Sequence, residues 1–229
     1  MGRTRTVLAV ATIGLMVGVV GCSKDVTGTA RPDPATAPLA LSDDGFGIVA
    51  GYDDADAQIE IFTEPQCTHC HDLQQDFGDQ IAYYVTVGGL QVTYRPLTFL
   101  DQDTESGYSA TVANAMFVAA EPAGDATTTG TQFQRFVEQL WAQQDPGGPA
   151  FTGDELRDIA RGAGLPEAVA ESVSRDQEAV DIAAMEEANF SLLYDTDPVS
   201  TGTPTVVDLR SGEKIDLTDD AWLDQLVAS

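Results

Sequence analysis

Residues 58–70 decide the fold of this chain, and they read Gln58-Ile59-Glu60-Ile61-Phe62-Thr63-Glu64-Pro65-Gln66-Cys67-Thr68-His69-Cys70. Polar and apolar side chains alternate over the first six, three of which are β-branched, and this predicts a β-strand. From Cys67 to about Val85, apolar residues recur at intervals of three and four, which predicts a helix. The pair Gly88-Gly89 ends that helix, and residues 90–100 predict a second strand. Together these segments predict a βαβ unit with two cysteines where the first strand meets the helix.

The rest of the chain predicts a helical block followed by a ββα end. Helical periodicity is present in four segments: 104–120, 132–144, 153–163 and 167–193. Their large apolar residues are expected in the core, among them Met116, Phe117, Trp141 and Met185. A strand at 205–209 is expected to turn at Ser211-Gly212 into a strand at 214–217, and Thr218 is expected to cap a final helix. This order predicts an α/β fold in which the helical block is an insertion in a single sheet.

The N-terminus has the pattern of an export signal. Arg3 and Arg5 precede fourteen uncharged residues, 7–20, which are too few to span a bilayer comfortably. Residues 1–21 are therefore predicted to be a signal peptide. The signal peptide ends in Val19-Val20-Gly21, and with the next residue, Cys22, this resembles the lipobox of bacterial lipoproteins. In those proteins the cysteine is lipidated and becomes the new N-terminus. The alternative is a plain signal peptide that leaves Cys22 as a free thiol.

Residues 22–44 are rich in Ser, Thr, Ala, Asp and Pro, which predicts a flexible tether between the lipid anchor and the folded part. The expected location is extracytoplasmic, on the outer face of the cytoplasmic membrane.

Composition restricts the classes of partner. The chain has 37 acidic residues against 11 lysines and arginines, a net charge of −26. Such a surface repels phosphate backbones, so a nucleic-acid partner is not expected. Its three cysteines are too few for a framework of structural disulfides, and two of them form a Cys-x-x-Cys motif.

That motif has the chemistry of disulfide exchange. A cysteine at a helix N-terminus is stabilised as a thiolate by unsatisfied backbone N–H groups, and the thiolate is the nucleophile. Cys70, one turn later, can attack a mixed disulfide on Cys67 and release the substrate. His69, when protonated, adds positive charge beside the thiolate, whereas nearby carboxylates such as Glu64 oppose it.

A second motif completes a family pattern. Gly202-Thr203-Pro204-Thr205 stands just before the late strand, 134 residues after Cys70. With the strand at 59–64 and the Cys-Thr-His-Cys motif, it resembles the DsbA-like branch of the thioredoxin superfamily, over residues 46–229. The resemblance implies a thioredoxin fold with an inserted helical subdomain. Its first half covers residues 45–103, the insertion 104–197 and the second half 198–229.

The resemblance also implies roles for particular residues. Cys67 is the attacking thiol, Cys70 the resolving thiol, and Thr203 with a cis Pro204 forms the substrate platform. No cofactor or metal is implied. The implied substrates are exported proteins with cysteine pairs, oxidised to disulfides by a monomer that a quinone-linked membrane protein, DsbB-like or VKOR-like, reoxidises.

The chain departs from the family pattern at two positions. Thr68 replaces the proline common in the DsbA-like dipeptide, and this leaves the redox potential open. Ile61 stands where thioredoxins carry a buried acid, so Glu60 or Glu64 is the candidate for handling its proton.

Other functions remain open from the sequence. A reductase or isomerase would use the same two cysteines in the other direction. Cys67-Thr68-His69-Cys70-His71 also matches the attachment signature of c-type haem, with His71 as proximal ligand and Met116 or Met185 as distal ligand. Two further alternatives are a metal site at Cys67, Cys70 and His71 and a holdase without redox activity. The sequence shows no second pair of zinc ligands for the metal site.

Overall fold

The computed structural model describes residues 36–103, 106–175 and 177–229. The predicted signal peptide, Cys22 and the tether up to residue 35 lie outside the described residues. Within the described ranges, no helix is long and apolar enough to cross a membrane.

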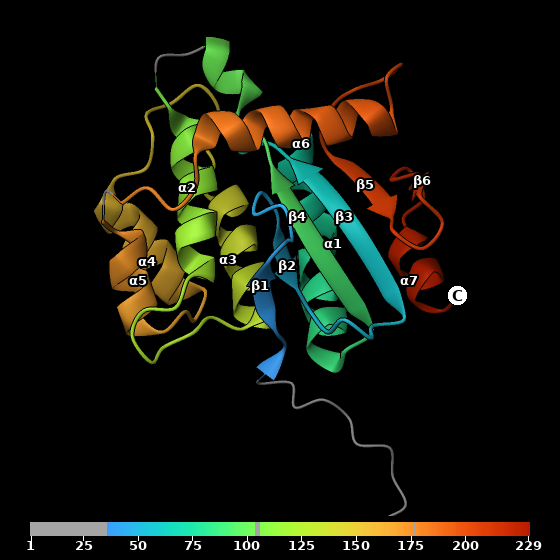
Figure 1. Ribbon diagram of the computed structural model, residues 1–229, viewed down its shortest axis with the longest axis horizontal. Helices are drawn as coiled ribbons and strands as arrows, with labels where there is room; N and C mark the ends of the chain where they lie inside the picture. Colours follow the sequence, from blue (N-terminus) through green and yellow to red (C-terminus); the bar gives the residue numbers. More distant parts are fainter. Residues whose placement is uncertain (1–35, 104–105, 176) are drawn as a thin grey trace, which may run out of the picture. The chain divides into compact units, whose positions relative to one another are not determined.

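In the described part of the chain, six strands form one mixed sheet in the order β1-β2-β4-β3-β5-β6 (Figure 1). Their bounds are β1 Leu39–Leu41, β2 Ile48–Ala50, β3 Ala57–Thr63, β4 Leu90–Pro96, β5 Thr205–Asp208 and β6 Glu213–Lys214. β3 and β4 are parallel, and the other neighbours are antiparallel. The predicted βαβ unit is confirmed, because α1 connects the two parallel strands.

The helices are α1 Thr68–Val87, α2 Tyr108–Ala120, α3 Gly130–Ala142, α4 Gly153–Gly162, α5 Glu167–Val173, α6 Ile182–Thr196 and α7 Trp222–Val227. A 3₁₀ helix, Phe99–Asp103, follows β4. α1 ends where Gly88 adopts φ 77°, a left-handed conformation that favours glycine.

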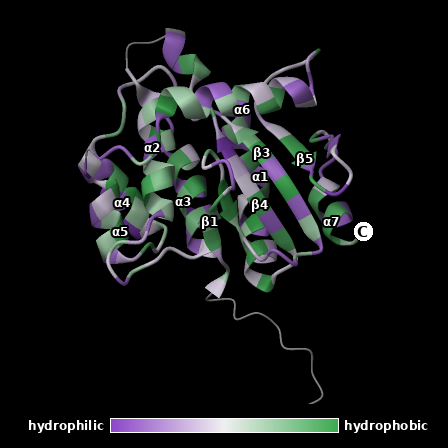
Figure 2. Ribbon diagram, in the orientation of Figure 1, coloured by the Kyte–Doolittle hydropathy of each residue, from purple (hydrophilic) through white to green (hydrophobic). Residues whose placement is uncertain are grey.

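The main core lies between the sheet and α1. Hydrophobic and hydrophilic residues alternate along β3 and β4 (Figure 2), so one set of side chains points to α1. Ile61 and Tyr94 are fully buried on that side with Ile81 of α1. On the opposite side, a smaller cluster forms where Leu193 of α6 covers Phe62. The rings of Phe77 and Trp222 pack 5.3 Å apart and attach α7 to α1.

The helical insertion shares this core. Met116, Phe117, Trp141 and Met185 are all buried in the same cluster as the sheet residues, as predicted. α3 packs closely on α1, and at Gly78 an added Cβ would lie 2.6 Å from Cγ of Glu138. A larger residue at this position of α1 would therefore require the Glu138 side chain to move.

The folded part begins earlier than the predicted boundary at residue 45. β1 pairs with β2, and the Ala37 and Pro38 carbonyls accept hydrogen bonds from Gly130 and Gly51. Asp44 forms an ion pair with Arg95 at 2.6 Å. The prediction of a flexible tether up to residue 44 is therefore wrong for its last residues. Composition indicated flexibility, but pairing with distant segments gives these residues structure.

Several predicted elements have different bounds, among them β6, which ends at Lys214 rather than at residue 217. β4 ends at Pro96, not at residue 100, and the chain turns into the 3₁₀ helix. The single helix expected over 167–193 is two helices, because Asn114 hydrogen-bonds the backbone of Gln177 and Ala179 in an intervening segment. Thr218 does not cap α7: its hydroxyl donates to Asp216, and the helix begins at Trp222.

Candidate active site

Cys67 is the N-cap residue of α1, and its side chain is half-buried. Its carbonyl accepts hydrogen bonds from the backbone N–H groups of Cys70 and His71, which fixes the first turn of the helix. The pKa of Cys67 is lowered to about 5, first by a hydrogen bond from the Cys70 thiol, then by Thr203 and the backbone N–H groups of Cys70 and His69. The thiolate at the helix N-terminus, expected from the sequence, is thus the stable form at neutral pH.

Cys70 has the opposite character. It is fully buried one turn into α1, and neither cysteine is in a disulfide. Burial raises the pKa of its thiol well above the usual range, and the neighbouring Cys67 sulfur adds to the effect. The pair therefore consists of one accessible thiolate and one buried thiol, which are the properties required of an attacking and a resolving cysteine.

The Gly-Thr-Pro-Thr motif faces this pair. The Thr203–Pro204 peptide bond is cis, as the resemblance implied. In its thiol form, Cys67 donates from Sγ to the carbonyl oxygen of Thr203 at 3.2 Å. Folding thus brings together two segments that lie 136 residues apart.

A buried acid lies behind the cysteines, and it is Glu64 rather than Glu60. Glu60 accepts from Nε of Arg95 at 2.6 Å, on the side of the sheet away from α1. Glu64 is fully buried, and its Oε2 accepts from the N–H of Gln66 at 2.6 Å while Oε1 accepts from the Ser109 hydroxyl. Burial raises the pKa of Glu64 to about 7, so this carboxyl can hold or release a proton near neutrality.

The insertion holds the turn that leads into Cys67. Gln144, just after α3, donates from Nε2 to the carbonyl of Pro65 at 2.8 Å and, more distantly, to that of Cys67 at 3.4 Å. The side chain of Gln66 accepts from Gly147 N–H at 3.0 Å and donates to Ser109 at 3.0 Å. These bonds connect the active-site turn to both α2 and the end of α3.

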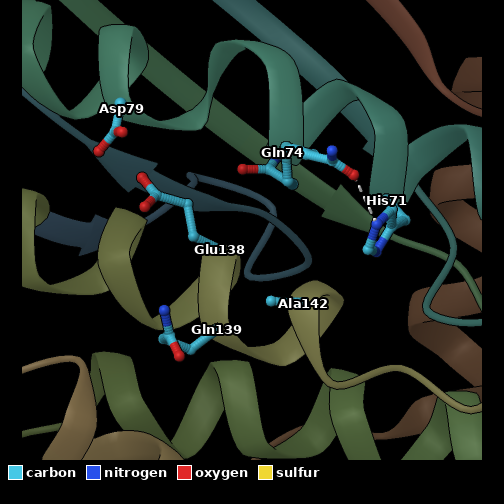
Figure 3. Close-up of a pocket in the computed structure, with 7 residues that line it drawn as sticks. His71, Gln74, Asp79, Glu138, Gln139 and Ala142 are labelled. Atoms are coloured by element: carbon cyan, nitrogen blue, oxygen red, sulfur yellow. Dashed lines mark hydrogen bonds between the residues drawn. The ribbon is translucent and has the colours of Figure 1, made fainter.

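The two histidines have different positions. His69 is exposed, and in the described ranges its ring makes no hydrogen bond; only its backbone N–H faces the Cys67 sulfur. His71 donates from Nδ1 to the carbonyl of Trp141 at 2.8 Å, because a carbonyl can only accept. Figure 3 shows His71 at one end of a polar cleft between α1 and α3, with Asp79 and Glu138 at the other end.

This position of His71 bears on the non-redox alternatives. Its ring is held against α3, and among the described residues no group of three or more His, Cys, Asp or Glu side chains is placed to hold a metal ion. Met116 and Met185, the possible distal ligands for haem, are fully buried in the core. The geometry therefore favours disulfide exchange over haem or metal binding.

A groove of about 400 Å³ opens beside Cys67, between the 3₁₀ helix, α6 and the segment before the cis proline. We call it the thiol groove, and it is lined by Gln66, Cys67, Thr68, Phe99, Leu100, Phe190, Leu193, Thr201, Gly202 and Thr203. Sequence reasoning missed Ser109, Gln144 and Phe190. Each of them lies in a helix or loop without a sequence motif, and only its contacts in the folded protein show that it belongs to the site.

The comparisons with known proteins agree with this geometry. The family model described as thioredoxin matches residues 43–223. No curated protein sequence matches the chain. MdbA, a thiol-disulfide oxidoreductase from Corynebacterium matruchotii, has a similar structure: TM-score 0.66 at 19% identity, over 83% of this chain and 92% of that one.

Two further solved structures are similar. MdbA from Corynebacterium diphtheriae has a TM-score of 0.63 at 23% identity and covers 83% of this chain and 94% of its own. Reduced DsbA from Mycobacterium tuberculosis has a TM-score of 0.58 at 20% identity, over 84% and 88%. At these identities the likeness shows a shared fold, which is the thioredoxin fold with helices seen in DsbA structures.

Proposed function

The chain belongs to the thioredoxin family, and from this premise we propose that it is a thiol–disulfide oxidoreductase that oxidises cysteine pairs of exported proteins. The observation that carries the proposal is the opposite shift of the two thiols. The pKa of Cys67 is lowered to about 5, whereas that of the buried Cys70 is raised. A dithiol with this asymmetry reacts at one sulfur and resolves at the other.

The first step forms a mixed disulfide. With Cys67 and Cys70 joined as a disulfide, a substrate thiolate attacks Sγ of Cys67. The bond between the two enzyme sulfurs breaks, and Cys70 leaves as a thiolate. Because burial raises the pKa of Cys70, this sulfur takes up a proton at once, and the carboxyl of Glu64, with a pKa of about 7, is the candidate donor.

The second step releases the product. A second substrate thiolate attacks the substrate sulfur of the mixed disulfide, and Cys67 leaves as a thiolate. Two electrons have then passed from the substrate to the enzyme, whose two cysteines are reduced. A thiol of low pKa is the better leaving group, and a stabilised thiolate favours the reduced enzyme, so substrate oxidation is the favoured direction.

The remaining roles are part of the same proposal. Thr203 and Pro204 bind the main chain of the substrate beside Cys67, and His69 adds positive charge to the first turn when protonated. The signal peptide 1–21 exports the chain, and lipid on Cys22 holds it at the outer face of the membrane. A DsbB-like or VKOR-like membrane protein returns the two cysteines to the disulfide. If Cys22→Ser were retained on membranes as firmly as wild type, the lipid anchor would be excluded.

The reduction potential of the Cys67–Cys70 pair tests the direction. The protein is equilibrated in glutathione buffers, and the fraction of free thiol is measured. We expect a value of about −120 mV, typical of strong oxidants. A value of about −270 mV, as in thioredoxin, would instead indicate a reductase. Cys67→Ser should abolish exchange, and Cys70→Ser should accumulate mixed disulfides; exchange by Cys67→Ser would disprove the assignment.

A further inference from the structure

A second hollow adjoins the thiol groove, with walls from the 3₁₀ helix and α6. We call it the α6 cleft. It has a volume of about 650 Å³ and is lined by Phe99, Gln102, Glu186, Glu187, Phe190, Ser191 and Tyr194. Phe99 and Phe190 line both hollows and pack edge to face with ring centroids 6.3 Å apart. A chain bound in the thiol groove can therefore continue across this aromatic pair into the α6 cleft.

The walls of the α6 cleft include large apolar surfaces exposed to water. Phe190 is 41% exposed and Tyr194 is 51% exposed. Both side chains could be buried further by a bound side chain, with a gain in free energy that scales with the apolar area removed from water. Adjacent exposed aromatic residues beside a reactive thiol are typical of an interaction surface.

The charged side chains that line the α6 cleft are all negative. Glu186 is fixed at its wall, because Oε2 accepts from the N–H of Thr98 at 2.5 Å and from its hydroxyl at 3.1 Å. Glu187 is exposed one residue further along α6. In the part of the chain that the structure describes, neither glutamate is in an ion pair, and no Lys, Arg or His lines either hollow.

We propose that the α6 cleft is a specificity subsite for client polypeptides in which a large apolar or aromatic residue and a lysine or arginine lie near the reacting cysteine. This inference rests on the proposed function, because the client is the cysteine-containing substrate. The apolar side chain fills the cleft against Phe190 and Tyr194. The cation binds at Glu187, where an aromatic ring also attracts it. The strong negative charge of the whole chain brings such segments to the site.

Binding is measured first without redox chemistry. The full chain carrying Cys67→Ser is titrated, under reducing conditions, into fluorescent ten-residue peptides with one cysteine. An aromatic residue is placed at each position from one to five on either side of that cysteine. Each peptide is made in three forms with lysine, glutamine or glutamate beside the aromatic residue, and in a fourth form with lysine beside a serine that replaces the aromatic residue.

The subsite predicts two separable effects. At the best position, replacing the aromatic residue by serine should weaken binding about tenfold. Replacing lysine by glutamine should weaken it about two- to fivefold, as for an exposed ion pair, and glutamate should weaken it further. Glu187→Gln should remove the preference for lysine, and Phe190→Ser or Tyr194→Ser should remove the preference for the aromatic residue. Glu121→Gln, exposed beyond the far end of α2, is the matched control and should leave both preferences unchanged.

Equal binding of all peptides would overturn the subsite, as would preferences that survive in Glu187→Gln and in both aromatic variants. It is also overturned if sedimentation shows a dimer that Phe190→Ser dissociates and the peptides show no preference, because the cleft is then an interface between copies. Wild-type oxidation of two-cysteine peptides separates this inference from the proposed function. Oxidation without preference leaves the oxidoreductase and removes the subsite, whereas selective binding without any exchange leaves the subsite and removes the oxidoreductase.

Discussion

Replacing Glu64 by glutamine should make the protein more stable at alkaline pH and should leave its structure intact. The carboxylate accepts one hydrogen bond from Gln66 N–H and one from the Ser109 hydroxyl. In Glu64→Gln, the amide oxygen can accept from Gln66 N–H, and the amide nitrogen can donate to the Ser109 oxygen in a hydrogen bond of reversed direction, so both partners are kept. The substitution therefore removes the charge while it preserves the shape and the contacts.

The magnitude follows from the two pKa values of this carboxyl. Burial raises it to about 7 in the native state from an ordinary value of 4.5. Between these values the native protein holds a proton that the unfolded chain has released, so the free energy of unfolding falls as pH rises. At about 1.4 kcal/mol per pH unit this amounts to about 3 kcal/mol in all, of which about 2.5 kcal/mol is lost between pH 5 and pH 8.

Urea unfolding at pH 5, 6, 7 and 8 measures the effect. Both proteins carry Cys67→Ser, so that the thiolate does not titrate. The advantage of Glu64→Gln in unfolding free energy should grow by about 2.5 kcal/mol over this range. Lower pH is avoided because loss of negative charge favours association of an acidic chain.

Glu155→Gln is the matched control for this experiment. A hydrogen bond from the Thr152 N–H lowers the pKa of Glu155, so its contribution is present above pH 4.5 and is lost only at lower pH. Its difference from wild type should therefore stay constant from pH 5 to pH 8. A constant difference for Glu64→Gln as well, or a variant less stable than wild type at pH 8, would refute the idea that Glu64 holds its proton by burial.

Iodoacetamide should modify Cys67 but not Cys70 in the reduced protein, at a rate whose pH midpoint lies at about 5; an adduct on Cys70 in mass spectrometry, or a midpoint above pH 8, would contradict the asymmetry of the thiols. Arg95→Met should lower the unfolding free energy by about 2–4 kcal/mol, because it leaves the carboxylates of Asp44 and Glu60 without their cation, whereas Arg161→Met, on an exposed helix face, should have a much smaller effect. Chemical denaturation of the two variants distinguishes these cases, and equal losses would show that Arg95 has no special role. A chain that begins at residue 36 should unfold at the same urea concentration as the full chain. A chain that begins at residue 45 should unfold at a lower urea concentration, because it lacks β1 and Asp44. Identical midpoints would show that the flexible tether does extend to residue 44.

The sequence by itself determined the parts of this protein that depend on neighbours along the chain. Alternation over 58–63 and three-to-four periodicity after Cys67 predicted β3 and α1, because each pattern is a property of one regular element. The helix terminus predicted the direction of the pKa shift of Cys67, to which the Cys70 thiol contributes most and the backbone N–H groups of the next residues add. The core positions of Trp141 and Met185 followed from periodicity in the same way.

Local sequence patterns could not predict the elements that are defined by pairing between distant segments. β1 is three residues long and has no periodicity of its own; its hydrogen bonds to β2 define it. The break between α5 and α6 is fixed by the side chain of Asn114, more than sixty residues earlier. The Thr218 cap failed for a local reason, because its hydroxyl donates to the side chain of Asp216 two residues earlier.

Only the tertiary structure decided which acid serves the site and what surrounds the thiol. The sequence offered Glu60 and Glu64 equally, and burial beside Ser109 singled out Glu64, whereas Arg95 neutralises Glu60. The carbonyl of Thr203 reaches Cys67 across 136 residues, and the α6 cleft has walls from two separate segments. Burial and electrostatic coupling depend on distance through space, and a linear pattern carries no measure of that distance until the chain has folded.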